Sequence, residues 1–175
     1  MDPTDATPAL GPADPADRAA LALAREVGRR MWSEDPTPRS LGIELLEIRP
    51  GYARMRMAVR GDMTNGHGLC HGGYTFLLAD STFAYACNSH GQRAVAASAE
   101  IHFLAPAFAG DVLTAEGLEQ HLGGRSGVYD MRVTDQHGRV IALFRGKSAT
   151  IRGRIEEAAA PAAAPAPSDS EDGRR

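Results

Sequence analysis

Residues 74–87 of the chain read YTFLLADSTFAYAC, a run without proline or glycine. Its apolar residues fall on every face of a helical projection, which predicts a long α-helix buried on all sides. Residues 61–73 contain five glycines and are expected to form a loop before it. Asn88 or Gly91 is expected to end the helix. A buried helix of this length needs a covering layer from the rest of the chain.

The flanking sequence supplies strand patterns for that layer. Strands joined by short turns form antiparallel sheets, and one buried helix against one curved sheet is an α+β architecture. Because a single sheet leaves apolar surface uncovered, we also expect the chain to form oligomers. The expected strands are residues 41–49, 52–59, 94–104, 110–120, 126–134 and 140–151.

A further helix is expected near the N-terminus. Asp14 is a suitable N-cap and Pro15 a suitable first helical residue, whereas Pro36 and Pro38 are expected to stop the helix. Its apolar positions follow the three-to-four spacing of one helix face: Leu21, Ala24, Val27 and Met31.

Length and composition bound the class of protein. The chain has 175 residues and a formal net charge of −3, which fits one domain and argues against a nucleic-acid binder. It shows no secretory signal, no apolar run of ~20 residues that would span a membrane, and too few cysteines for a disulfide framework. We therefore expect a cytoplasmic protein with its domain at residues 14–154, between disordered segments at 1–13 and 155–175.

Gly72 and Gly73 stand where the long helix is expected to begin. The first N–H groups of a helix lack partners within the helix, and glycine leaves them accessible because it has no side chain. Such a helix start attracts developing negative charge, including that of a polarised carbonyl oxygen. Both glycines are therefore candidates to bind a carbonyl substrate.

Asp80 lies in the middle of the same helix, among apolar neighbours. A buried carboxylate is costly without a partner, so it is expected either to bond structurally, to Ser81, Thr82 or a facing strand, or to act as a general base. Gly72 and Asp80 are eight positions apart, which is ~12 Å along a helix. An aspartate side chain is too short to close that gap, so if both groups act on one carbonyl they must come from two chains related by a two-fold axis.

Four other polar residues are candidates, each with a structural alternative. Asn65 either makes a turn or holds Asp80 or a water, and His71 is either a structural or a catalytic histidine. Ser98 lies either on a polar strand face or beside an attacking water. Arg125 lies either in a solvated loop or against an anionic ligand.

His67, Cys70 and His71 also permit other chemistry. Their spacing allows zinc binding, but no second Cys/His pair follows at the required distance. Cys70 as a nucleophile with His71 as its base is disfavoured because adjacent side chains rarely face each other. We therefore expect no metal and no cofactor.

Several segments together resemble the PaaI-type hotdog-fold thioesterases of phenylacetate degradation, over about residues 40–153. They are the helix-start segment 65–73, the Leu78-Ala79-Asp80 step, and residues 83–89 and 101–106. The resemblance implies a hotdog fold, in which a curved antiparallel sheet wraps a long helix. It also implies hydrolysis of acyl-CoA to the free acid and CoA, with aryl-acetyl groups such as phenylacetyl or its hydroxylated and ring-modified forms.

The same resemblance implies roles for individual residues. Asp80 matches the nucleophile or general base, and the Gly72 amide matches the donor that polarises the carbonyl. Asn65 and His71 match supporting positions, and Ser98 matches a hydroxyl that positions water. Apart from the resemblance, Gly73 at the helix start and Arg125 and Ser126 in the glycine-rich segment 123–127 are expected to contact substrate or CoA. The resemblance also implies dimers with shared sites, paired into homotetramers.

Two alternative functions stay open at this point. A hotdog dehydratase or hydratase acting on hydroxyacyl thioesters usually relies on a histidine paired with an acid, and His71 keeps that reading open. A non-catalytic acyl-CoA-binding module would bind the thioester without releasing thiol.

Overall fold

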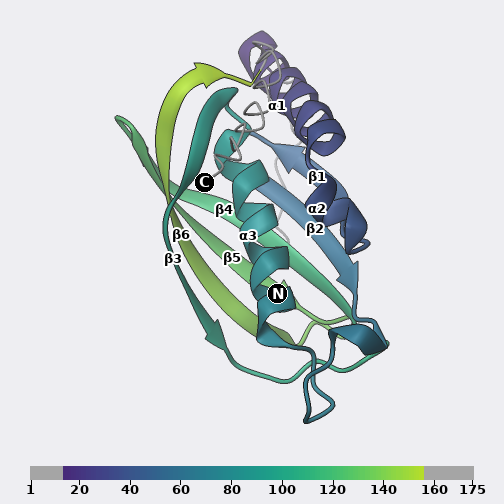
Figure 1. Cartoon of the computed structure of the whole chain (residues 1–175). Helices are drawn as coiled ribbons and strands as arrows, with labels where there is room; N and C mark the ends of the chain where they lie inside the picture. The colour runs from purple at the N-terminus through teal and green to yellow at the C-terminus, as the bar shows by residue number, and fades with distance from the viewer. Residues whose placement is uncertain (1–13, 156–175) are drawn as a thin grey trace, which may run out of the picture.

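A computed structural model describes residues 14–155, in which a curved six-stranded antiparallel sheet wraps around one long helix (Figure 1). The strand order is β1-β2-β4-β5-β6-β3. The predicted α+β fold, with its long helix and its N-terminal helix, is confirmed. The elements are α1 (Pro15–Glu34), α2 (Pro36–Ser40), β1 (Glu44–Arg49), β2 (Tyr52–Ala58), the 3₁₀ turn η1 (Gly61–Met63), α3 (Gly72–Asn88), β3 (Gln92–Phe103), β4 (Val112–Gly123), β5 (Ser126–Thr134) and β6 (Val140–Arg154).

The core lies between the sheet and α3. The Phe83 ring packs edge-on against Tyr129 at 5.5 Å between centroids and also contacts Phe144. The helix ends at Asn88, whose side chain accepts from the Ala94 N–H at 2.9 Å and donates to the Ala94 carbonyl at 3.0 Å. These two bonds fix the last turn of α3 against β3.

One stripe of α3 is less buried than predicted. Leu77, Asp80, Ser81 and Ala84 are only half-buried, whereas the sheet-facing Leu78, Ala79, Phe83 and Ala86 are fully covered. The stripe recurs every three to four residues, so it is one face of the helix. A single copy of the chain therefore leaves this face of α3 partly open.

β3 is an edge strand, and almost all of its residues are exposed. Its pairing with β6 shifts register twice: between Gln92 and Ala94 the extra residues lie on β6, and between Ala96 and Ser98 the extra residue is Ala97 of β3 itself. Val95 and Phe103 are exposed large apolar side chains on it, at 47% and 55%. Long apolar edges normally pair with another strand, so β3 is a candidate interface.

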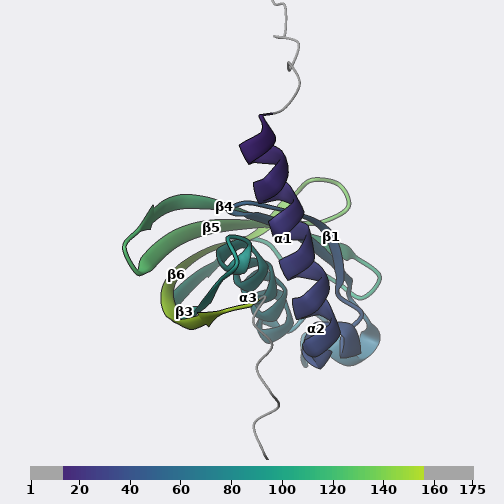
Figure 2. The same cartoon turned by 90° about the horizontal axis from the view of Figure 1, so that it is seen from above.

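α1 packs against β1 and α3, along the opposite edge of the sheet (Figure 2). Asp14 caps it as predicted, by accepting from the Ala16 N–H at 3.0 Å. Pro36 does not simply stop the helical structure, because it begins α2 after Asp35 has capped that short helix. As a result the strand expected at 41–49 starts only at Glu44.

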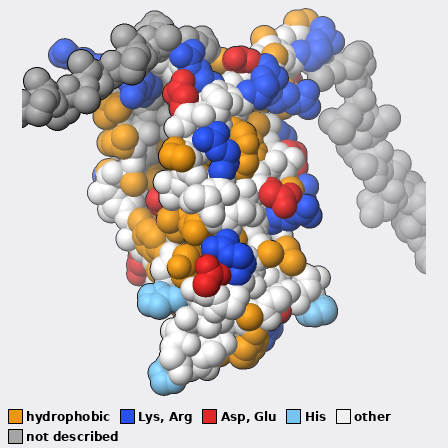
Figure 3. Space-filling view, turned by 45° about the vertical axis from the view of Figure 1, so that its right-hand side comes forward, with side chains coloured by type: hydrophobic (Ala, Val, Ile, Leu, Met, Phe, Trp, Pro, Cys, Tyr) orange, Lys and Arg blue, Asp and Glu red, His pale blue; other side chains and the backbone are white. Residues whose placement is uncertain are grey.

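Figure 3 shows the side of the molecule that carries α1, where Lys and Arg side chains gather toward the top of the view. No helix within residues 14–155 is both long and apolar enough to cross a membrane. The predicted domain end at 154 coincides with the last residue of β6. The predictions for residues 1–13 and 156–175 lie outside the described residues.

Candidate active site

The two principal candidates lie at different places on α3 and line different cavities. Asp80 lines a cavity of about 380 Å³ formed by α1, α3, β3 and the end of β6. Gly72 lines a cavity of about 470 Å³, and its walls also include Asn65, Phe103 and residues 104–107. The structure therefore keeps the two groups apart within one chain, as the distance along the helix requires.

Asp80 makes no hydrogen bond or ion pair with residues 14–155, so the structural alternatives considered for it are absent there. Thr82, one expected partner, instead donates to the Leu78 carbonyl at 2.8 Å. Burial raises the pKa of the Asp80 carboxyl above its usual range. A half-buried carboxylate of this kind is a stronger base than an exposed one and is open to a ligand.

Gly72 is the first residue of α3. Within residues 14–155 its N–H makes no hydrogen bond, whereas the neighbouring amides are occupied: Gly73 donates to His71 Nδ1 at 3.1 Å and Tyr74 to the His71 carbonyl at 2.9 Å. A Cβ on Gly72 would lie 3.0 Å from Cζ of the Phe103 ring. Gly72 thus offers a free donor beneath an aromatic ring, and its lack of a side chain is what leaves room for that ring.

His71 is the N-cap of α3. Because its Nδ1 accepts from the Gly73 N–H, the neutral ring carries its proton on Nε2. The structural alternative for His71 is therefore realised. The same bond uses the Gly73 amide, which leaves Gly72 as the freer donor of the pair.

Asn65 makes the turn that was considered as its structural alternative. Its Oδ1 accepts from the His67 N–H at 2.9 Å and from the Leu69 N–H at 3.3 Å. Two backbone donors on one oxygen fix the orientation of the amide, so the Nδ2 group is the part left to donate. Asn65 lines the same cavity as Gly72, and turn chemistry and a site role are compatible here.

Cys70 and the neighbouring histidines do not form a reactive cluster. Burial raises the pKa of the Cys70 thiol, so it stays protonated near neutral pH. Its Sγ lies 3.7 Å from the His71 carbonyl and 3.8 Å from Thr75 Oγ1, not against an imidazole. Among residues 14–155 no group of three or more His, Cys, Asp or Glu side chains is placed to hold a metal ion.

Ser98, Arg125 and Ser126 lie outside both cavities. Ser98 is exposed and follows Ala97, the extra residue of the β3 bulge. The Arg125 guanidinium donates to the Thr150 carbonyl at 3.0 and 3.3 Å, and Ser126 Oγ donates to the Ser148 carbonyl at 3.2 Å. These bonds brace the β5–β6 pairing, and the structure does not bring Arg125 and Ser126 together with Gly72 or Asp80.

Phe103 lines the Gly72 cavity but is not among the residues predicted from the sequence. The 101–106 segment was recognised only as part of a resemblance, and the position of the ring over Gly72 depends on how β3 leaves the sheet.

Comparison with known proteins places this arrangement in a family. The model of the thioesterase superfamily matches residues 67–142. The acyl-coenzyme A thioesterase PaaI of Escherichia coli is 48% identical over 125 residues, which are 71% of this chain and 89% of that protein.

This chain belongs to the thioesterase superfamily. Among solved structures, the E. coli PaaI protein matches this thioesterase with a TM-score of 0.76 and 44% identity, covering 77% of this chain and 98% of that one. A Streptococcus mutans protein solved with acetyl-CoA bound matches with a TM-score of 0.62 and 27% identity, covering 64% and 90%. The predicted hotdog fold, the PaaI-type resemblance and the class of thioester hydrolase are confirmed.

Proposed function

We propose that this thioesterase hydrolyses acyl-CoA to the free acid and CoA, with aryl-acetyl groups as the acyl part. One observation carries the proposal: α3 holds an unpartnered carboxylate, Asp80, and an unpartnered amide, Gly72, in separate cavities. These are the base and the carbonyl-polarising donor that thioester hydrolysis needs. The relatives named acyl-CoA thioesterase and the acetyl-CoA-bound structure support CoA as the leaving group.

A second copy of the chain would complete the site. Val95, near the Asp80 cavity, and Phe103, near the Gly72 cavity, lie toward opposite ends of the exposed edge strand β3. Antiparallel pairing of two β3 strands about an axis near Ser98 would set Val95 of one copy opposite Phe103 of the other. Each Asp80 cavity would then meet the partner copy's Gly72 cavity, giving two equivalent sites. Ser98, next to the axis, is placed to reach a water in either site. Pairing of two such dimers into a tetramer is part of the proposal.

The chemistry then follows from the groups at hand. The thioester oxygen accepts from the Gly72 N–H, with the Asn65 amide as a second donor. Asp80 of the other copy takes a proton from water as the hydroxide adds to the carbonyl carbon, and the C–S bond breaks to release the CoA thiolate. Direct attack by an Asp80 oxygen, followed by hydrolysis of the resulting anhydride, uses the same groups. The amide donor supplies ~3 kcal/mol, and the base ~10²–10⁴ in rate.

Hydrolysis is favoured over the two alternative functions. In a dehydratase or hydratase a histidine works with an acid, but His71 Nδ1 is bonded to the Gly73 N–H, and within residues 14–155 the ring pairs with no carboxylate. A pure binding module has no use for an unpartnered, base-like Asp80.

Thiol release from phenylacetyl-CoA tests the function directly. The wild type is expected to turn over, and Asp80→Asn to keep its oligomer while losing ~10²–10⁴ in kcat. Asp17→Asn, which makes the same chemical change on the exposed first turn of α1, is the control. Tight binding without thiol release by the wild type would refute the proposal.

A further inference from the structure

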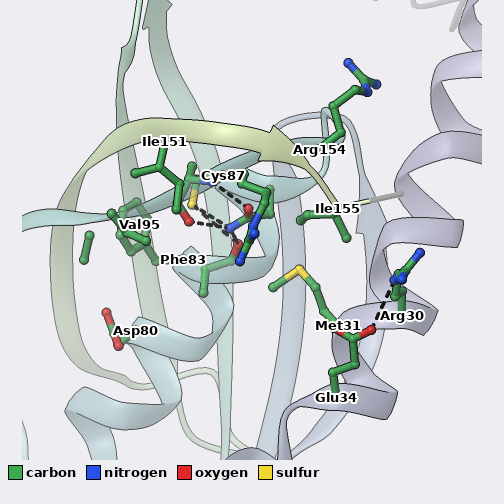
Figure 4. A pocket seen from close by; sticks show the side chains of 15 residues that line it. Arg30, Met31, Glu34, Asp80, Phe83, Cys87, Val95, Ile151, Arg154 and Ile155 are labelled. Carbon is green, nitrogen blue, oxygen red and sulfur yellow. Dashed lines mark hydrogen bonds and ion pairs between the residues drawn. The ribbon is translucent and has the colours of Figure 1, made fainter. Parts of the chain in front are cut away.

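The cavity beside Asp80 is lined by both apolar and charged side chains. Its walls come from four elements that are distant in sequence (Figure 4). A ligand pocket of ordinary size holds ~300–1,000 Å³, so this cavity of about 380 Å³ fits a short acyl group. Its apolar lining consists of Met31, Phe83, Ala84, Cys87, Ala94, Val95, Ala96, Ile151 and Ile155.

Charged side chains line the same cavity unevenly. Arg30 and Glu34 of α1 pair at 3.1 Å (Figure 4), and Arg154 lies at the end of β6. Arg93 makes no hydrogen bond or ion pair through its guanidinium to any residue in the range 14–155. Apart from Asp80, the cavity therefore has three cations and one acid, and one of those cations is unneutralised.

Local backbone features leave room for Arg93 at the edge of the cavity. It lies between two paired positions of β3, Gln92 and Ala94, where three residues of β6, 151–153, face it, so β6 carries the bulge and the ladder is locally disrupted there. Residues 93–96 all line the cavity, which strict alternation would not allow. Opposite it, Gly153 has φ +96°, and a Cβ there would lie 3.3 Å from Arg93 Cδ. The glycine thus leaves space for the stem of the arginine.

The separation between Arg93 and Asp80 sets a length for the ligand. Ala94 is hydrogen-bonded to Asn88, so Arg93 lies level with the last turn of α3. Asn88 is eight residues beyond Asp80, or ~12 Å along the helix. A water at Asp80 and a hydrogen bond at the far end each take ~3 Å. With the guanidinium at the level of its own backbone, about 6 Å remain, which equals a chain of five C–C bonds of ~1.5 Å in zigzag.

We infer that Arg93 is a specificity-determining residue that binds a carboxylate at the distal end of the acyl group. The enzyme then prefers acidic acyl groups over neutral ones of equal length. The acidic groups are ω-carboxyacyl chains of about six carbons and aryl-acetyl groups with an acidic substituent at the far ring position. A guanidinium pairs with a carboxylate through two parallel hydrogen bonds. This inference rests on the proposed function, because it places the acyl group in the Asp80 cavity.

The test compares adipoyl-CoA with hexanoyl-CoA, which differ only in a terminal carboxylate against a methyl group. For the wild type, kcat/KM is expected to be at least ~10-fold higher for adipoyl-CoA, since a charge-assisted pair discriminates by that factor or more. Arg93→Gln is expected to remove the difference while leaving hexanoyl-CoA hydrolysis within ~2-fold. Arg152→Gln, an exposed arginine of β6 that lines neither cavity, makes the same charge change and is expected to keep the preference.

A second variant checks the geometry from the other side. Gly153→Ala crowds the Arg93 stem and also strains a backbone at φ +96°, so the readout is the ratio of kcat/KM for the two substrates, and the adipoyl preference is expected to fall. If Arg93→Gln lowered kcat/KM equally for adipoyl-CoA and hexanoyl-CoA, the arginine would bind a CoA phosphate instead, and the inference would be overturned. An unchanged substrate ratio would overturn it as well. Failure of the wild type to hydrolyse either thioester would refute the proposed function itself, which keeps the two failures distinct.

Discussion

Replacing Gly72 with proline removes the one N–H on which the proposed polarisation of the carbonyl depends. Proline suits the first position of a helix, where no intrahelical bond is lost. The preceding residue, His71, has φ −63° and ψ 129°, a conformation that a following proline accepts. The capping bond from Gly73 to His71 does not involve the Gly72 N–H. The substitution therefore deletes a donor without breaking a helical hydrogen bond, although its side chain meets the Phe103 ring.

Gly72→Ala is the matched control, because it adds the same Cβ against Phe103 but keeps the N–H. That contact at 3.0 Å falls on the edge of a ring that is 55% exposed in the single chain. Loss of one carbonyl-binding donor costs ~10²–10³ in kcat, or ~3 kcal/mol. We expect Gly72→Pro to show this loss relative to Gly72→Ala, while the two variants unfold within ~0.5 kcal/mol of each other.

The assay is thiol release from phenylacetyl-CoA, run beside thermal unfolding and size-exclusion chromatography. The comparison counts only if both variants keep the wild-type oligomer, which the chromatography checks. Equal kcat for the proline and alanine variants would refute the reasoning, since the amide would then take no part in catalysis.

Three further predictions concern the stability and chemistry of α3 and its loop. Burial raises the pKa of the Asp80 carboxyl in the folded state, so its contribution to stability is full below the unfolded-state pKa and is lost as pH rises through the folded-state pKa. Asp80→Asn should therefore be at least as stable as wild type in urea at pH 7, with this advantage vanishing in acid, and a less stable variant at pH 7 would contradict the argument. Wild-type kcat/KM should rise with pH between the same two pKa values. Asn65→Asp keeps the oxygen that accepts from the backbone but loses the amide donor and adds a charge near Gly72. Its kcat should therefore fall by ~10² or more with an unchanged circular dichroism spectrum. A variant that turns over as fast as the wild type would exclude a donor role for Asn65. His71→Ala removes the N-cap and should cost ~1 kcal/mol in chemical denaturation, while His71→Asn, a preferred N-cap, restores it; equal stability of the two would argue against capping.

Much of the fold could be predicted from local patterns. The strand at Ser126–Thr134 was predicted with its observed bounds, and α1 begins at the predicted cap and proline. Both depend on signals within a few residues, namely alternation, capping and turn glycines. Pro36 was misjudged because proline stops one helix and also starts the next, and only the Asp35 cap distinguishes the two outcomes.

The site was predictable in part. The distance along the helix between Gly72 and Asp80 predicts that the two groups lie apart within one chain. The structure places them in different cavities. Phe103, and Arg93 as a proposed site residue, were not predicted, because their positions depend on the register shifts between β3 and β6 and on the path of the chain after β3. Register of this kind is set by tertiary pairing, which local sequence patterns do not encode.

Mixing two inactive variants measures most directly whether the catalytic groups come from different subunits. In a mixed dimer of Asp80→Asn and Gly72→Pro chains, one site joins the intact carboxylate of one chain to the intact amide of the other. After unfolding and refolding together in equal amounts, the two are expected to recover about one quarter of wild-type activity, since half the dimers are mixed and each has one good site. No recovery, with mixed dimers present by native mass spectrometry, would contradict the shared site.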